Sequence, residues 1–231
     1  MTRVKICGLM TAEDIRLCVK AGADAVGFVT EYPIPVPWNI DRTRARELVA
    51  LTPPFVTKTA VVGGPPESIL QIADTVKPDL LQLHGDETRK EIEHICSALE
   101  NTGIQVIKAL RIDIDTGKAH FSIEDPLEAA KVLAGTAIAG LVVDSKTAHR
   151  PAGTGVPLDW SIIERIASSI SIPLILAGGL TVNNVSEAIE RVRPYGVDVI
   201  SGVEKAPGVK DNKRVRQFVR AVKQIRMLGD I

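Results

Sequence analysis

The 231-residue chain is poor in aromatic side chains, in cysteine and in net charge. Phe, Trp and Tyr together make up 3% of the residues, so the core has to be aliphatic, which suits stacked Val, Ile and Leu strands better than an aromatic-rich sandwich. The three cysteines, Cys7, Cys18 and Cys96, are too few and too scattered for a disulfide framework or a zinc site. We therefore expect no disulfide and no bound metal.

Charge of either sign is not in excess, and long apolar runs are missing. Lys plus Arg and Asp plus Glu each number 28, so the chain lacks the basic footprint of a nucleic-acid-binding protein. No run approaches the roughly 18 apolar residues that span a bilayer. The first ten residues, MTRVKICGLM, lack the apolar stretch of a signal peptide. We expect a cytoplasmic protein with neither a nucleic-acid nor a membrane partner.

What the chain does contain is a regular alternation of short apolar runs and longer amphipathic stretches. The short runs are typical of strands buried on both faces, and Ser, Thr, Asp or Pro start signals precede most of the longer stretches, which predicts helices. The apolar runs lie at 4–7, 25–29, 59–62, 80–83, 106–110, 140–143, 173–177 and 197–200. The helical stretches lie at 12–21, 42–51, 65–76, 86–99, 124–133, 160–170, 182–192 and 211–227.

Strict alternation of this kind indicates parallel strands joined by right-handed crossovers. An open doubly wound sheet is one solution, but it usually carries a glycine fingerprint after its first strand. Here that turn reads CGLMTAED at 7–14, with no G-x-G-x-x-G, and the glycine clusters follow the last two runs instead. We predict an α/β fold in which residues 1–231 form a single domain, a parallel eight-stranded (β/α)8 TIM barrel.

In such a barrel the active site lies at the C-terminal ends of the strands. Lys5 and Cys7 share one face of the first run, so both are expected to point into the barrel, where the cation would favour the thiolate. Gln82 and His84 share a face of the fourth run, and Asp144 ends the sixth. Each has a structural alternative: Cys7 as a small core residue, His84 as a turn residue and Asp144 as a cap of the next loop.

Two glycine-rich segments follow the seventh and eighth runs in the pattern of a phosphate site. LAGGL at 176–180 leads into the helix expected after Thr181, and VISGVE occupies 199–204. Glycines let backbone amides approach phosphate oxygens, and the positive end of a helix stabilises their charge. The candidate phosphate-binding residues are Gly178, Gly179, Ser201 and Gly202. They predict a phosphorylated small molecule as the ligand.

Taken together and in order, these motifs resemble those of the phosphoribosylanthranilate isomerase family of tryptophan biosynthesis. The matching segments are KICGL at 5–9, GADAVGFV at 22–29, LLQLHG at 80–85, LVVDS at 141–145, AGTGVPLDW at 152–160, LAGGL at 176–180, and GVDVISGVE with PGVKD within 196–211. The resemblance implies an Amadori rearrangement without a cofactor, from N-(5-phosphoribosyl)anthranilate to 1-(2-carboxyphenylamino)-1-deoxyribulose 5-phosphate. By family role, Asp144 would be the general acid that opens the sugar ring, and Cys7 the general base at C2.

One motif departs from the family pattern. The family usually carries an Arg after the second strand that meets the anthranilate carboxylate, whereas TEYPIPVPWNIDR at 30–42 has Trp38 at that place. Alternating prolines predict a stiff, extended arm, from which Trp38 would either contact the anthranilate ring or pack on a neighbouring loop. Arg42 is slightly favoured over Arg111 as the cation for the carboxylate. The expected substrate-binding set is Lys5, Trp38, Arg42, Gln82, His84 and Arg111.

Two other functions remain open at this point. The lost Arg motivates a catalytically weak or retuned paralogue that binds a phosphorylated ligand. A third hypothesis is another sugar-phosphate barrel enzyme, such as a ribulose-phosphate epimerase, which would need a metal held by His and Asp. Among the histidines, only His84 lies at the end of a predicted strand, so no such cluster of metal ligands is evident. The sequence leaves the choice between a monomer and a homodimer undecided.

Overall fold

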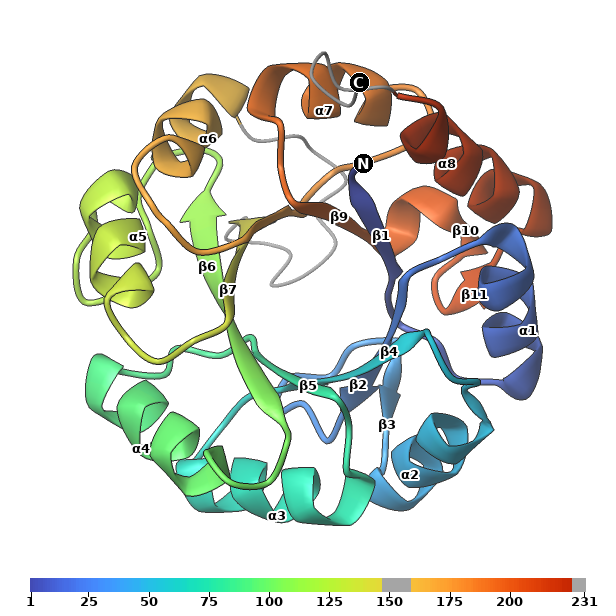
Figure 1. Cartoon of the computed structure of the whole chain (residues 1–231), viewed down its shortest axis with the longest axis horizontal. Coiled ribbons are helices and arrows are strands. Elements are labelled where there is room, and N and C mark those ends of the chain that lie inside the picture. The colour runs from blue at the N-terminus through green and yellow to red at the C-terminus, as the bar shows by residue number, and fades with distance from the viewer. Residues whose placement is uncertain (147–158, 226–231) are drawn as a thin grey trace.

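Eight parallel strands close into a ring in the computed structural model, which describes residues 1–146 and 159–225 (Figure 1). The ring closes because β1 pairs with β9 on one side and with β2 on the other. The barrel strands are β1 (Arg3–Ile6), β2 (Ala25–Thr30), β4 (Thr57–Val62), β5 (Leu80–Leu83), β6 (Gln105–Asp113), β7 (Gly140–Lys146), β8 (Leu174–Leu176) and β9 (Gly196–Val199). The predicted (β/α)8 barrel is confirmed.

The helices form an outer layer around this ring (Figure 1). They are α1 (Ala12–Ala21), α2 (Arg42–Leu51), α3 (Pro66–Val76), α4 (Arg89–Leu99), α5 (Pro126–Ala134), α6 (Trp160–Ala167), α7 (Val185–Val192) and α8 (Asn212–Gln224). Thr11, Asp41 and Asp125 cap their helices as their side-chain chemistry predicts, each by accepting a backbone N–H. None of the helices in the described ranges is both long and apolar enough to span a bilayer.

Two predicted helix starts are wrong, and one of them concerns the candidate phosphate site. Helix α4 begins after Thr88, whose capping box with Glu91 replaces the expected start at residue 86. Helix α7 begins at Val185 instead of residue 182. Asn184 accepts the N–H of Thr181 through Oδ1 and donates through Nδ2 to the carbonyl of Gly179, so its side chain holds the glycine loop after β8. The predicted end of the last helix, residue 227, lies outside the described residues.

The strands separate two apolar layers. Outward-facing residues such as Val4, Ile6 and Val197 pack under the helices. Inside the barrel, one cluster consists of Ile107, Ala109, Val142 and Ala177. A second inner cluster, at the C-terminal end, consists of Cys7, Val29, Tyr32, Trp38 and Val61. Period two along β1 therefore works as predicted, and Cys7 lies inside the barrel at its mouth.

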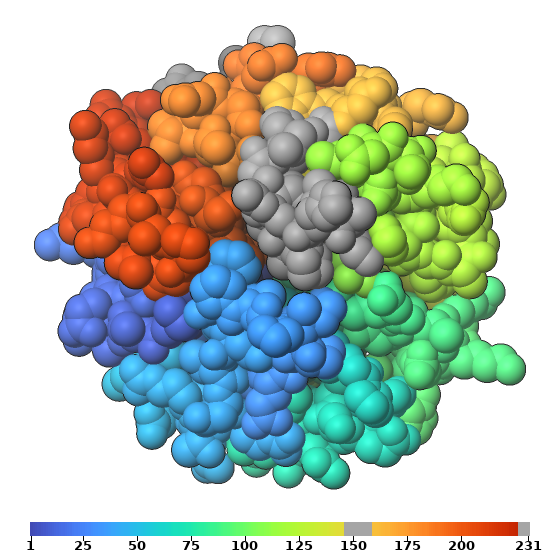
Figure 2. All heavy atoms as spheres, turned by 180° about the vertical axis from the view of Figure 1, so that it is seen from behind, coloured from blue at the N-terminus to red at the C-terminus, as the bar shows by residue number. Residues whose placement is uncertain are grey.

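Short extra elements shape this mouth. The segment after β2 leaves the barrel and returns as β3 (Asn39–Ile40), which pairs with the end of β2. After β9 come a 3-10 turn, η1 (Ser201–Val203), and an antiparallel hairpin of β10 (Glu204–Ala206) and β11 (Val209–Lys210). Figure 2 shows the two regions meeting at one face, the blue surface of the early chain against the orange-red surface of the late chain.

Candidate active site

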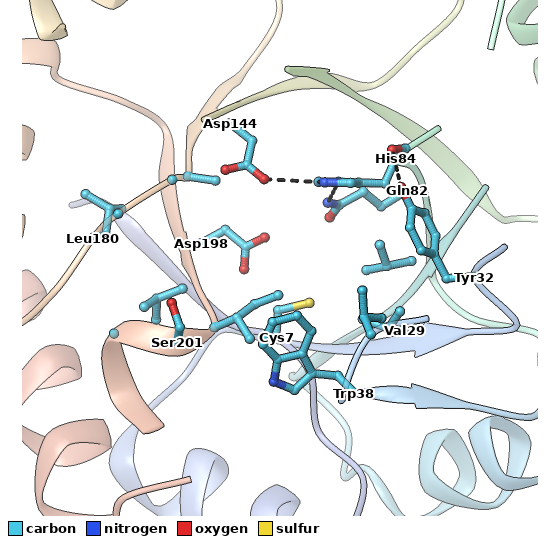
Figure 3. A pocket seen from close by; sticks show the side chains of 18 residues that line it. Cys7, Val29, Tyr32, Trp38, Gln82, His84, Asp144, Leu180, Asp198 and Ser201 are labelled. Atoms are coloured by element: carbon cyan, nitrogen blue, oxygen red, sulfur yellow. Dashed lines mark hydrogen bonds and ion pairs between the residues drawn. The ribbon is translucent and has the colours of Figure 1, made fainter. Parts of the chain in front are cut away.

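A pocket partly open to solvent lies at the C-terminal ends of the strands (Figure 3). Its polar lining comes from widely separated parts of the sequence, as expected for this fold. The polar and glycine residues in the lining are Cys7, Tyr32, Trp38, Gln82, His84, Asp144, Gly178, Gly179, Asp198, Ser201 and Gly202. The structure therefore brings together both predicted catalytic residues and all four predicted phosphate-binding residues.

One wall of the pocket carries a chain of three polar side chains. Gln82 Nε2 lies 3.2 Å from His84 Nδ1, and His84 Nε2 lies 3.4 Å from Asp144 Oδ2 (Figure 3). His84 therefore lies between Gln82 on its Nδ1 side and Asp144 on its Nε2 side. The other carboxyl oxygen, Asp144 Oδ1, accepts the N–H of Ser145 at 2.7 Å. The orientation of the Asp144 carboxyl group is thus set from two sides.

The opposite wall carries Cys7, and its electrostatics differ from the prediction. Lys5 does point into the barrel, but it lies beneath the pocket and its Nζ binds Asp198 Oδ2 at 2.7 Å. Burial raises the pKa of the Cys7 thiol; Lys5 acts to lower it, and Asp198 raises it again. Lys5 therefore favours the thiolate as expected, but burial and Asp198 together outweigh it, and the pKa of Cys7 stays above that of a free thiol.

Sequence reasoning missed Asp198, which lies between Cys7 and Asp144 in the pocket (Figure 3). Its Oδ2 binds Lys5, whereas its buried Oδ1 has no hydrogen-bond partner among the described residues. A buried carboxylate oxygen without a donor is costly, so a donor on a bound molecule would be favoured there. The signal was present in the sequence, because a charged residue interrupts the apolar run VDVI of β9.

The glycine loops after β8 and β9 meet at one end of the pocket. Gly178 and Gly179 both adopt left-handed φ angles, 78° and 63°. Gly202 packs so closely that a Cβ there would overlap the carbonyl oxygen of Leu180, and a Cβ at Gly178 would lie 2.9 Å from Asp144 Oδ1. The backbone amides at positions 179, 180, 201 and 202 have no acceptor within the ranges that the structure describes. They form a cradle of free donors suited to an anion.

The arm after β2 supplies the other end of the pocket. Trp38 is 5% exposed, lines the pocket and stacks so tightly over Gly8 that a Cβ there would lie 2.8 Å from Trp38 Cδ1. Its Nε1 also donates to Glu204 Oε1 at 2.7 Å, and Lys210 Nζ donates to the same oxygen at 2.7 Å. The alternative in which Trp38 packs on a neighbouring loop is confirmed by its bond to the hairpin, while its ring also lines the pocket, so contact with the anthranilate ring stays a prediction.

Three residues of the predicted substrate-binding set are not brought to the pocket lining: Lys5, Arg42 and Arg111. Arg42 binds Glu31 with two bonds, Nε at 2.8 Å and Nη2 at 2.6 Å, outside the pocket. Arg111 lies buried within β6, binds Asp86 and lines a neighbouring hollow that shares Tyr32 with the pocket. Within the described ranges no Lys or Arg lines the pocket, and no group of three His, Cys, Asp or Glu side chains is arranged to hold a metal ion.

The chain is similar to known proteins along nearly its whole length. Residues 4–221 match the family model described as N-(5'-phosphoribosyl)anthranilate isomerase. The isomerase of that name from Haloferax volcanii is 40% identical over 229 residues, covering 98% of this chain and 95% of the relative.

Two solved structures are similar along the whole barrel. A phosphoribosyl anthranilate isomerase in complex with reduced 1-(o-carboxyphenylamino)-1-deoxyribulose 5-phosphate has a TM-score of 0.78 and 33% identity, with 97% of this chain and 100% of that chain covered. A monomer form of the dimeric isomerase from Thermotoga maritima has a TM-score of 0.79 and 32% identity, with the same coverage. The chain therefore belongs to the N-(5'-phosphoribosyl)anthranilate isomerase family.

Proposed function

We propose that this pocket converts N-(5'-phosphoribosyl)anthranilate to 1-(2-carboxyphenylamino)-1-deoxyribulose 5-phosphate by acid–base catalysis. The observation that carries the proposal is the placement of Asp144 and Cys7 on opposite walls of one pocket (Figure 3). An aldose–ketose shift needs one group that gives a proton to oxygen and another that takes a proton from carbon. A cradle of amides at one end and apolar side chains at the other match the two halves of this substrate.

The general acid in this proposal is Asp144. It donates a proton to the furanose ring oxygen, the bond between that oxygen and C1 breaks, and the nitrogen lone pair forms the C1=N bond of a protonated Schiff base. His84 and the Ser145 amide keep the carboxyl group directed during this step. Asp144 needs no large displacement, since its side chain already lines the pocket.

The general base is Cys7. Its thiolate removes the proton from C2, the C–H electron pair forms the C1=C2 bond, and the C1=N pair returns to nitrogen to give an enolamine. Loss of the proton from the C2 hydroxyl and protonation at C1 then yield the ketose. The unpartnered Oδ1 of Asp198 lies beside Cys7 and is suited to accept a hydrogen bond from a sugar hydroxyl.

The two ends of the substrate would bind at opposite ends of the pocket. The phosphate meets the amides at 179, 180, 201 and 202, and the anthranilate ring lies against Trp38, Val29 and Tyr32. In Figure 3, Leu180 and Ser201 lie on the far side of the pocket from Tyr32 and Val29. Aromatic contact with Trp38 would take over part of the binding that an Arg supplies in the family pattern.

The test is growth of a tryptophan-auxotrophic host that lacks this isomerase. The wild-type chain should restore growth without tryptophan, and Asp144→Asn should not, although it stays soluble and binds the product. Soluble wild-type protein that fails to restore growth would favour the alternative of a binding paralogue. Loss of both folding and product binding in Asp144→Asn would instead make Asp144 a structural cap.

We also infer that two copies of the chain associate through the pole opposite the pocket. Phe55, which precedes β4 at that pole, is fully exposed at a relative accessibility of 105% and has a left-handed φ of 66°. A fully solvated Phe held in a conformation that side chains disfavour points to a partner surface. The dimeric relative from Thermotoga maritima supports a second copy as that partner.

A further inference from the structure

A buried ion pair lies behind the acid wall of the pocket without lining the pocket itself. Glu87, in the loop after β5, and Lys108, on β6, approach to 2.8 Å between Oε2 and Nζ. Both side chains are 2% exposed. Lys108 alternates with Ile107 and Ala109 along β6, so it points away from the barrel interior, toward the loop that carries Glu87.

The pair holds the backbone beside His84. Lys108 Nζ donates to the carbonyl of Gly85 at 2.8 Å, and Glu87 Oε1 accepts the N–H of Gly85 at 2.9 Å. Tyr32 donates its hydroxyl to the carbonyl of His84 at 3.0 Å. The carbonyl of His84 and the N–H of Gly85 belong to one peptide group, so this group is fixed at both ends. A Cβ at Gly85 would overlap Glu87 Oε1 and so displace the carboxylate that holds the Gly85 N–H.

Stability alone does not account for this pair. Removing two charges from water costs free energy that offsets most of their mutual attraction. Replacing such a pair by apolar residues of similar volume often leaves the fold equally stable or more stable. Burial disfavours the charged form of Lys108 and lowers its pKa, although Glu87 acts to raise it. The lowered pKa reflects the same cost of desolvation. What an apolar pair cannot supply is the set of directional bonds to the peptide that follows His84.

We propose that Glu87 and Lys108 are positioning residues, which hold the His84 imidazole against Asp144 and thereby direct the acid toward the substrate. The peptide group between residues 84 and 85 sets the position of the His84 Cα, from which the imidazole extends. Its Nε2 then lies 3.4 Å from Asp144 Oδ2. A looser peptide would let the ring turn away and free the Asp144 carboxyl group to rotate. The inference rests on the proposed role of Asp144 as the general acid.

The kinetic test uses the double variant Glu87→Leu/Lys108→Met, which removes both charges and keeps most of the volume. We expect kcat to fall about tenfold to a hundredfold, as for a small misplacement of a reacting group. We expect KM to stay within about twofold, because neither end of the substrate site is touched. The matched control is Lys223→Met, which breaks the half-buried pair with Asp24 near the start of β2 and should leave kcat unchanged.

A second readout does not depend on turnover. In protein with 15N-labelled histidine, Asp144→Asn should shift the Nε2 resonance of His84, and the double variant should reduce that response. If the wild type shows no isomerase activity, the proposed function fails while this comparison still decides the positioning role. An unchanged kcat together with an intact resonance response would overturn the inference. Should the double variant not fold, Lys108→Met, which removes the donor to the Gly85 carbonyl and the partner that holds the Glu87 carboxylate, carries both comparisons.

Discussion

At the scale of single residues, the proposed base is a buried thiol. Cys7 is 1% exposed and lies in the inner apolar cluster, so a serine fits the same space. Cys7→Ser should lower kcat by about a hundredfold or more, because a hydroxyl is far too weak an acid to replace a thiolate base. The melting temperature should change little. Steady-state kinetics and thermal unfolding check this, and near-normal turnover in the serine variant would rule out Cys7 as the base.

The raised pKa of Cys7 determines the sign of two pH effects. Activity should increase with pH beyond about 8.5, the value for a free thiol, since more thiolate forms. Stability should change in the opposite direction. The folded chain holds this proton more tightly than the unfolded chain, so the contribution of Cys7 is complete below the unfolded pKa and is lost as the pH rises.

Lys5→Met tests the electrostatic part of this argument. Without the lysine, the pKa of Cys7 should rise further, and the pH–rate profile should move to higher pH. Iodoacetamide alkylation against pH measures the thiolate directly. Burial also raises the pKa of Cys18 to about 12 and that of Cys96 to about 11, so the same titration of Cys7→Ser supplies the background to subtract. A profile that does not move would mean that Asp198 already cancels Lys5 completely.

At the scale of elements, the strands and most helix caps follow from local patterns in the sequence. Period two placed Cys7 inside the barrel, and glycine clusters marked the cradle, because both depend on neighbours along the chain. The residues that sequence reasoning missed have partners from distant segments. Glu204 accepts a hydrogen bond from Trp38, which lies 166 positions earlier in the chain. Asp198 accepts one from Lys5, which lies 193 positions earlier. The preference for Arg42 overlooked a nearby partner instead, since Glu31 lies 11 positions earlier and binds its guanidinium.

The proline-containing arm after β2 carries a prediction of its own. Trp38→Ala should raise KM about tenfold, because the ring loses its contact with the anthranilate half of the substrate and the hairpin loses a hydrogen bond. Arg42→Ala should leave KM within about twofold, since its guanidinium is bound to Glu31 outside the pocket. Substrate titrations of both variants side by side provide the comparison. An unchanged KM in Trp38→Ala would remove the arm from the substrate site.

At the scale of the whole molecule, catalysis and association are proposed for opposite poles of the barrel. The pocket occupies the C-terminal pole, and Phe55 lies at the other. Phe55→Asp should convert the proposed dimer to a monomer while kcat stays close to that of the wild type. Size-exclusion chromatography with light scattering measures the mass, and a wild-type monomer would contradict the proposed association. A large loss of kcat in a folded variant would mean that the two poles are coupled.

The closure of the ring through β1 and β9 has a consequence for how the protein is made. Cys7 leaves the ribosome well before Asp198 and the second glycine loop, which lie much later in the chain. The bond between Lys5 and Asp198 joins positions 193 residues apart, so the proposed base lacks its electrostatic surroundings until β9 has been synthesised. A nascent chain therefore carries a thiol without a working site, and truncated products of interrupted synthesis should be catalytically silent.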